Sequence, residues 1–243
     1  RGSFLGPCYS DKDVIFTLEK FNAKYRPMDE FELIKFISRE LAKNKIIGWF
    51  QGNSEFGPRA LGNRSILANP MNSEMQKNLN LKIKFRENFR PFAVSILEEE
   101  TSNYFDINDR SPYMLIVSTI IKSLRKKSKD DTKLSLSKIN EVRSKFPAIT
   151  HIDYSSRIQT VNEKNNYKFY NLLKKFKETS GSPMLINTSF NIRGEPVVNT
   201  PEDAYKCFMG TDIDILVINN NVLLKENQNT DVNFNYKNNF ELD

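Results

Sequence analysis

The chain has 243 residues, of which 36 are Lys or Arg and 30 are Asp or Glu, and its formal net charge is +6. A hydrophobic content of 39%, with 12% aromatic residues, is typical of a folded globular protein that buries a sizeable core. No apolar run approaches the roughly 18 residues of a membrane span, and no signal peptide is visible. Cys8 and Cys207 lack metal or disulfide spacing. These features exclude a membrane protein and a disulfide framework, and predict a reduced, cytoplasmic protein.

Helical and extended segments are mixed along the chain, which predicts an α/β sheet. The best helix signal comes late, because Thr200 can cap the helix, Pro201 stands in its first turn, Asp203 completes a capping box and Gly210 closes it. Helices are expected at residues 11–21, 29–43, 73–81, 167–179 and 201–209. Strands are expected at residues 46–50, 65–68, 92–97, 113–120, 158–161, 184–187 and 215–218.

We expect a single domain over residues 1–226. Within it, residues 122–145 are rich in lysine and poor in apolar residues, which indicates a solvated, mobile basic insertion. Residues 227–243 are rich in Asn and have no clear period, so they are expected to form a C-terminal tail.

The most informative motif is Gly-Pro-Arg-Ala-Leu-Gly-Asn-Arg-Ser-Ile at residues 57–66. It places Arg59 and Arg64 between two predicted strands, and its glycines leave main-chain amides open to approach. Guanidinium groups match phosphate oxygens bidentately, and free amides add further donors. The motif therefore predicts a phosphate-binding loop. The alternative is a glycine-rich hairpin with solvated arginines.

Cations alternate with apolar residues in a second motif, at residues 80–92. If Lys82, Lys84 and Arg86 are extended, period-two alternation puts all three charges on one face. Arg90 stands between Phe89 and Phe92 and next to a proline, a setting that restrains its guanidinium. For Lys82 we favour an edge-strand role that discourages aggregation. For Lys84 and Arg90 we favour ligand binding.

A third motif follows the apolar run that precedes residue 187. Asn187, Ser189 and Asn191 can donate or accept hydrogen bonds, and Arg193 adds a cation. Polar side chains at the carboxyl end of a strand are suited to ligand binding in open α/β sheets. The alternative is a turn held by its own Asx and Ser/Thr hydrogen bonds.

A metal site is not expected. His151 is the only histidine, and with Asp153 two residues later it offers too few ligands for zinc or iron. We interpret it as a structural residue.

The motifs together resemble the C-terminal, YrdC-like domain of the O-carbamoyltransferases that act on nodulation factor, cephamycin and tobramycin. The resemblance covers residues 6–220, and its ordered blocks are far more specific than a lone glycine pattern. The matching blocks are residues 48–52, 55–68, 86–87, 89–93, 150–153, 157–161, 185–191, 193–198 and 200–204.

The resemblance implies one half of a two-domain enzyme with a YrdC-like fold, a twisted open mixed sheet flanked by helices with a concave basic face. Such a domain binds ATP, Mg²⁺ with the nucleotide, and carbamoyl phosphate, and forms a carbamoyl-adenylate. An N-terminal ASKHA-type domain of the same polypeptide, which would hold any transition metal, transfers the carbamoyl group to a substrate hydroxyl. Since the chain begins without Met, we expect it to be an excised C-terminal piece.

Residue by residue, the ligand contacts implied by the resemblance fall on Arg59, Lys84, Arg90, Arg157, Asn187 and Ser189. Lys84, Arg90 and Ser189 are the expected catalytic residues. The expected substrate-binding residues are Arg59, Arg64, Arg86, Arg157, Asn187, Asn191 and Arg193.

Two other classes of function are left open. The cations interleaved with Phe85, Phe89 and Phe92 are also typical of an RNA-binding surface on which bases stack. The second is a regulatory domain without catalysis. Because the cations occur in phosphate-loop settings, small-molecule substrates are favoured and no nucleic-acid partner is expected. The sequence leaves the acceptor hydroxyl and the oligomeric state open.

Overall fold

The computed structural model of the protein describes residues 2–126, 141–229, 236 and 240. Their helices are α1 (Asp11–Lys20), α2 (Glu30–Ala42), α3 (Met75–Asn78), α4 (Tyr167–Ser180) and α5 (Pro201–Met209). A π-helix at Leu79–Ile83 continues α3. Short 3₁₀ helices lie at Glu98–Asn103, Lys122–Leu124, Pro147–Ile149 and Lys225–Asn227.

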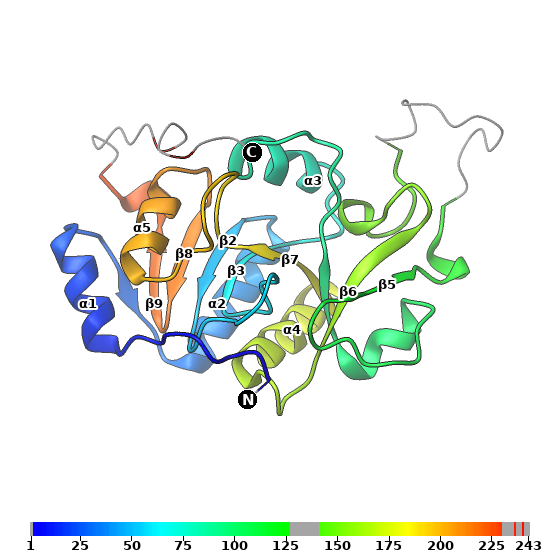
Figure 1. The fold of residues 1–243 in the computed structure, drawn as a ribbon, viewed down its shortest axis with the longest axis horizontal. Helices are drawn as coiled ribbons and strands as arrows, with labels where there is room; N and C mark the ends of the chain where they lie inside the picture. The colour runs from blue at the N-terminus through cyan, green and yellow to red at the C-terminus, as the bar shows by residue number, and fades with distance from the viewer. Residues whose placement is uncertain (1, 127–140, 230–235, 237–239, 241–243) are drawn as a thin grey trace.

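The strands form one open mixed sheet (Figure 1). Their order across the sheet is β1-β9-β8-β2-β3-β7-β4-β6-β5. The pairs β2–β8 and β4–β6 are parallel, and the other neighbouring strands are antiparallel. The strand bounds are β1 Arg26–Pro27, β2 Ile47–Phe50, β3 Arg64–Ala68, β4 Val94–Leu97, β5 Ile116–Thr119, β6 Ser155–Val161, β7 Met184–Ser189, β8 Ile215–Ile218 and β9 Asn221–Leu224.

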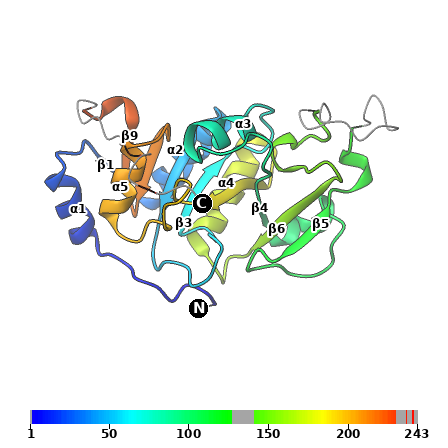
Figure 2. The same cartoon turned by 45° about the horizontal axis from the view of Figure 1, so that its top comes forward.

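Helices cover both faces of the sheet, and each face has its own apolar cluster (Figures 1 and 2). On one face, α2 and α4 pack side by side over strand residues such as Trp49 and Leu185. On the other face, α1, α5 and α3 pack over Phe50 and Ile186. Because successive strand residues point to opposite faces, a strand buried on both sides is apolar throughout. This explains the uninterrupted apolar runs of the sequence.

The fold prediction of a YrdC-like, open mixed sheet flanked by helices is confirmed, and the expected helices and strands are all present. The predicted capping box of α5 forms, with the Thr200 side chain accepting from the Asp203 amide at 3.1 Å and the Asp203 carboxylate accepting from the Thr200 amide at 2.9 Å. Strands β1 and β9, at one end of the sheet, were not predicted, since β1 has only two residues and β9 follows β8 after a two-residue turn.

The extended conformation considered for Lys82, Lys84 and Arg86, and the edge-strand role favoured for Lys82, are not what the structure shows. Residues 79–83 form the π-helix, and the chain then turns at Phe85, whose φ is 47°. Lys82 is exposed, Lys84 is buried and Arg86 lies between these extremes, so the three cations do not share a face. A run of alternating charges is compatible with this helical turn because apolar Leu79 and Ile83 still reach the core.

Much of the predicted basic insertion at 122–145, and most of the predicted tail at 227–243, lies outside the described residues. The domain bounds remain predictions. Across the part of the chain that the structure describes, none of the helices combines the length and the apolar character that crossing a membrane requires.

Candidate active site

Four strands bring the predicted motifs to one edge of the sheet. Because β3 and β4 both run antiparallel to β7, their first residues lie beside the carboxyl end of β7. In this register Ser65 pairs with Ser189, and Val94 pairs with both Ile186 and Ile158. The loops that enter β3 and β4, the end of β7 and the first half of β6 therefore meet at the same place.

A cavity of about 300 Å³ opens at this edge, and we call it the arginine pocket. It contains six of the predicted site residues, four of which are arginines. Of the described residues that line it, none is acidic. The lining residues are Pro58, Arg59, Ala60, Arg86, Arg90, Pro91, Phe92, Ala93, Met114, Arg157, Asn187, Thr188 and Ser189.

The guanidinium groups of this pocket repel one another. Burial lowers the pKa of Arg157, and the charge of Arg59 lowers it further. Burial likewise lowers the pKa of Arg86 to about 10, with added repulsion from Arg90 and Arg157. The Nε atoms of Arg59 and Arg157 are buried and have no hydrogen-bond partner among the described residues. Unpartnered buried donors are costly, and so is the mutual repulsion of cations around one cavity, so a negative charge in the cavity would relieve the repulsion.

Asn80 fixes the loop that carries Arg86 and Arg90. Its side chain is fully buried in the π-helix, and its amide donates to the backbone carbonyls of Asn88 at 3.1 Å and Arg90 at 2.9 Å. Its carbonyl accepts from Arg86 Nε at 2.7 Å. Arg86 also lies 5.0 Å from the centre of the Phe92 ring. Arg90 is half-exposed and pairs with Glu87 at 3.0 Å. Arg86 is thus held rigidly, whereas Arg90 can exchange its partner.

The glycine loop at residues 57–66 is organised differently from the prediction. Glu55 Oε1 accepts from the amides of Leu61 at 2.7 Å, Asn63 at 2.8 Å and Arg64 at 3.2 Å. The Gly62 amide donates to Ser65 Oγ at 3.0 Å. These amides are therefore not open to a ligand, because a buried amide needs a partner and Glu55 already supplies one. The loop contributes the Arg59 side chain instead.

Arg64 lies at the first position of β3, outside the arginine pocket. Its side chain is 1% exposed, and its guanidinium stacks on Phe50 with its carbon 3.6 Å from the ring centre. Its nitrogens donate to four backbone carbonyls, those of Gln51 at 2.6 Å, Asn63 at 3.0 Å, Pro7 at 3.0 Å and Gly52 at 3.1 Å. The structure thus gives Arg64 a role in joining the N-terminal segment to the sheet.

Asn187 forms the floor of the pocket. Its amide nitrogen donates to Ser95 Oγ at 2.9 Å, Gln159 Oε1 at 3.0 Å and the Ala60 carbonyl at 3.2 Å. Its Oδ1 is buried and has no partner among the described residues. The side chain is thus fixed by three contacts, and its unused group is a hydrogen-bond acceptor.

Lys84 lies behind Ser189 in a cage of four oxygens, which we call the lysine site. Its Nζ donates to the carbonyls of Ser189 at 2.5 Å and Asn191 at 2.8 Å, and contacts Asn191 Oδ1 at 2.9 Å and Ser189 Oγ at 3.3 Å. Burial lowers the pKa of Lys84 to about 7, and Arg86 adds repulsion. Ser189 therefore connects a titratable ammonium to the arginine pocket.

Two other predicted residues lie beside the pocket and do not line it. Asn191 shapes the lysine site, and Arg193 lies close enough to Glu87 to lower the pKa of that carboxylate. His151 is exposed and lies 3.6 Å from Asp153. No group of three or more His, Cys, Asp or Glu side chains that could hold a metal occurs among the described residues.

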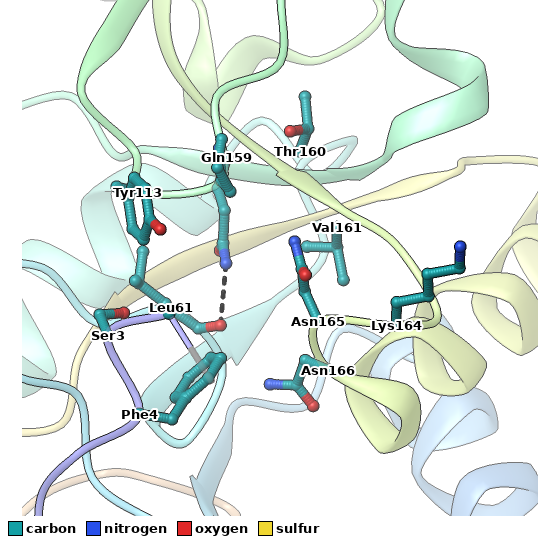
Figure 3. Close-up of a pocket in the computed structure, with 12 residues that line it drawn as sticks. Ser3, Phe4, Leu61, Tyr113, Gln159, Thr160, Val161, Lys164, Asn165 and Asn166 are labelled. Atoms are coloured by element: carbon teal, nitrogen blue, oxygen red, sulfur yellow. Dashed lines mark hydrogen bonds between the residues drawn. The ribbon is translucent and has the colours of Figure 1, made fainter.

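A second cavity, of about 90 Å³, is lined by residues that include Leu61, Tyr113 and Gln159 (Figure 3). Gln159 connects this cavity to the arginine pocket, because its carbonyl accepts from Asn187, which lines that pocket, while its amide donates to the Leu61 carbonyl at 2.8 Å. Figure 3 shows that Tyr113 and Leu61 line the same side of this cavity. Both also line an open apolar groove with Phe56 and Leu115, and that groove shares Pro58 and Arg59 with the arginine pocket.

Sequence reasoning missed the residues that hold the site residues in place: Asn80, Glu55, Ser95, Gln159 and Glu195. The partners of Ser95 and Gln159 are remote in sequence, as Gln159 contacts Leu61 98 residues earlier. Asn80 and Glu55 instead bond residues within ten positions along the chain. The signal available in the sequence was a polar residue within or beside an apolar run, as at Asn80 and Gln159, which indicates a buried side chain with a hydrogen-bonding role.

The sequence pattern of the family described as carbamoyltransferase C-terminus matches residues 38–225, which include every predicted site residue. This chain belongs to that family. The arginine pocket and the lysine site are therefore features of a carbamoyltransferase C-terminal domain.

Several relatives are similar over most of the chain. An uncharacterised protein of Synechocystis is 46% identical over 93% of this chain, which spans 38% of that protein. Nodulation protein NolO of Bradyrhizobium diazoefficiens is 39% identical over 73% of this chain and 30% of its own length. The 3'-hydroxymethylcephem-O-carbamoyltransferase of Amycolatopsis lactamdurans is 35% identical over 73% of this chain and 29% of its own length. The chain thus spans about a third of these relatives.

Among solved structures, full-length HypF in the phosphate- and nucleotide-bound form is similar in fold, with a TM-score of 0.50 and 17% identity. The similarity covers 82% of this chain and 22% of HypF. At this level of identity the similarity is one of fold.

Proposed function

We propose that the arginine pocket binds ATP and carbamoyl phosphate and forms a carbamoyl-adenylate. The observation that carries this proposal is the set of four arginines around one cavity, two of them with buried Nε donors that have no partner among the described residues. Guanidinium groups bind phosphate bidentately, and the charges of two phosphorylated substrates require several cations.

The proposed chemistry has two steps. Water first cleaves carbamoyl phosphate to carbamate and inorganic phosphate. A carbamate oxygen then attacks the α-phosphorus of ATP, forming the carbamoyl-adenylate and breaking the bond to pyrophosphate, which leaves with the electron pair. Carbamate and triphosphate repel each other, so the role of Arg59, Arg86, Arg90 and Arg157 is to neutralise that repulsion and the charge on the leaving pyrophosphate.

Two neutral residues suit the carbamoyl group. We assign to the unpartnered Asn187 Oδ1 a hydrogen bond from an N–H of the carbamoyl group. Ser189 Oγ donates to Asn191 Oδ1 at 2.6 Å and can rotate to donate to the carbonyl of the carbamoyl group instead. The apolar groove beside Arg59, with Tyr113 and Leu61, is suited to the nucleoside. Mg²⁺ would enter with the nucleotide and neutralise its phosphates.

Transfer to a hydroxyl is proposed for the complete protein. The name of the Amycolatopsis relative specifies O-carbamoyl transfer, and this chain spans 29% of that relative. We propose that another domain of the same polypeptide accepts the carbamoyl-adenylate and uses it on a small-molecule hydroxyl.

An RNA-binding surface is less well supported by the geometry. Stacking needs exposed rings in a row, but Phe92 is 3% exposed and Phe85 packs against the core, which leaves Phe89 as the exposed ring of the three.

Calorimetric titration of this chain with Mg-ATP, with carbamoyl phosphate and with both tests the proposal, together with an assay for pyrophosphate release. We expect each ligand to bind the wild type, and Arg90→Ala to weaken ATP binding about tenfold, as loss of one charge-assisted hydrogen bond predicts. The matched control is Arg39→Ala, which removes an exposed arginine of α2 that does not line the pocket. If the wild type binds neither ligand at low salt, the proposal is wrong.

A further inference from the structure

Tyr236, beyond the region matched by the family pattern, is buried against the far side of the lysine site. Its side chain is 5% exposed and belongs to the core cluster of α1 and α5. The ring packs against the end of α5 so closely that a Cβ at Gly210 would lie 2.3 Å from Tyr236 Cγ. The Tyr236 ring also packs against the ring of Phe240, with 5.4 Å between the ring centres. Glycine at position 210 is what makes room for this ring.

The Tyr236 hydroxyl donates to the carboxylate of Glu195, which is itself 8% exposed. The other carboxylate oxygen accepts from the Ile192 amide at 2.7 Å, and the Cys207 thiol also contacts this group. Glu195 thus ties together the loop of residues 190–198, which closes with the Val198 amide donating to the Phe190 carbonyl at 2.9 Å. A buried carboxylate of this kind depends on its donors, because burial alone disfavours its charge.

The same loop contains Asn191, whose oxygens accept hydrogen bonds from Lys84 Nζ. The Glu195 backbone carbonyl accepts from Asn191 Nδ2 at 2.6 Å, which leaves Asn191 Oδ1 facing Lys84 Nζ at 2.9 Å and Ser189 Oγ at 2.6 Å. Two sets of hydrogen bonds therefore meet at Glu195: its carboxylate accepts from Tyr236, and its backbone carbonyl accepts from Asn191, which contacts Lys84 and Ser189. Ser189 lines the arginine pocket.

We propose that Tyr236 is a positioning residue for the proposed reaction, acting through Glu195 to hold Asn191, and with it Lys84 and Ser189, in the binding arrangement. Without the hydroxyl, the Glu195 carboxylate loses a buried donor and the 190–198 loop loses its central tie. Site residues from the middle of the chain are thus fixed by a residue from its C-terminal end.

The charged and titratable groups around Glu195 and Lys84 determine how loss of the Tyr236 hydroxyl changes the pKa values of these two residues. Glu195 and Cys207 favour the charged form of Lys84, and Arg86 disfavours it. Burial raises the pKa of Glu195, and the hydrogen bonds from Tyr236, the Ile192 amide and the Cys207 thiol, together with the charge of Lys84, offset part of that rise. Asp203 also acts on Tyr236, raising its pKa. Loss of the Tyr236 hydroxyl therefore raises the pKa of Glu195 and, through a weaker negative charge, lowers that of Lys84.

This inference rests on the proposed function, because the lysine site adjoins the arginine pocket. The first test therefore uses a readout that does not require catalysis. The pH titration of Lys84 is followed by NMR of lysine labelled with ¹³C at Cε, with the resonance assigned through Lys84→Arg. We expect Tyr236→Phe, which keeps the ring against Gly210, to move this titration to lower pH. The matched control is Tyr205→Phe, which removes the hydroxyl of another buried tyrosine of the same cluster and should leave the titration unchanged. Equal titrations in Tyr236→Phe and wild type would overturn the proposal.

The second test is a double-mutant cycle read out by the affinity for pyrophosphate. Glu195→Gln keeps an acceptor for the Ile192 amide but removes the charge. We expect Tyr236→Phe to weaken pyrophosphate binding about threefold to tenfold in the wild type and to have no further effect in Glu195→Gln. Additive effects would show that Tyr236 does not act through Glu195 and would overturn the proposal. If wild type binds no pyrophosphate, the proposed function fails, and the Lys84 titration still decides the role of Tyr236.

Discussion

The charge of Arg59 disfavours that of Arg157, both side chains line the same cavity, and each has a buried Nε without a partner among the described residues. Such an arrangement stores unfavourable energy in the absence of an anion, as functional sites commonly do. Stability and anion binding should therefore respond in opposite directions when one of these cations is removed.

Arg157→Met is predicted to stabilise the protein in the absence of anions. Methionine keeps an unbranched side chain of similar length and removes both the repulsion and the unpartnered donor, so we expect the free energy of unfolding to rise by about 1 kcal/mol. Urea denaturation in chloride buffer at low ionic strength measures this. Added pyrophosphate should stabilise the wild type much more than the variant. Destabilisation of the anion-free protein by Arg157→Met would contradict this account of the pocket.

Arg64→Ala is predicted to act on the fold and to leave the pocket intact. The substitution removes the contacts to four backbone carbonyls, two of them buried and two partly buried, and the stack on Phe50, and we expect a loss of about 3 kcal/mol in the free energy of unfolding. Arg64→Lys should recover little, because an ammonium lacks the planar fork.

The folded fraction of Arg64→Ala should bind pyrophosphate with wild-type affinity. Calorimetry under conditions where most of the variant is folded measures this. A large loss of affinity in folded protein would restore Arg64 to the ligand-binding set that the sequence predicted.

The sequence predicted the elements and most of the pocket, and it did so where the signal is local. The α5 capping box and the apolar run before Asn187 each lie within a few residues, and β-strand order then brings Arg59, Arg90 and Arg157 together. The contacts of Arg64 could not be predicted from the sequence. Its guanidinium donates to the backbone carbonyls of residues 7, 51 and 52, and where those carbonyls lie depends on the tertiary fold. The tie between Tyr236 and Glu195 spans 41 residues and has no local signal.

Gly62→Ala is predicted to be among the most damaging single substitutions in the glycine loop. Gly62 has φ +104°, and a Cβ there would lie 2.3 Å from Cδ1 of Phe169, a buried core residue of α4. Strain and overpacking together should lower the free energy of unfolding by about 3 kcal/mol. The matched control is Gly181→Ala at the end of α4, where φ is +78° but a Cβ meets nothing within 4 Å, so about 1 kcal/mol is expected. Equal losses in urea denaturation would mean that the contact with Phe169 is relieved by movement of the ring.

Proton uptake on anion binding is predicted from the lysine site. Burial lowers the pKa of Lys84 to about 7, so at pH 8 most of this side chain is neutral in the free protein. A polyanion in the adjoining pocket favours the charged form and raises this pKa, and binding at pH 8 must then take up a proton. At pH 6 the side chain is already charged and uptake should be near zero.

Calorimetric titration with pyrophosphate in two buffers of different ionisation enthalpy measures the uptake as a difference in apparent heat, after correction for protonation of pyrophosphate itself. Lys84→Arg should abolish the uptake at pH 8, because a guanidinium does not titrate in this range. Lys168→Met is the matched control, since burial also lowers the pKa of Lys168, to about 8. Its Nζ donates hydrogen bonds to Gln51, Asn219 and Asn220, which do not line the arginine pocket. Uptake that persists in Lys84→Arg and disappears in Lys168→Met would assign the proton to a lysine remote from the pocket, and Lys84 could then no longer be the group that titrates when the anion binds.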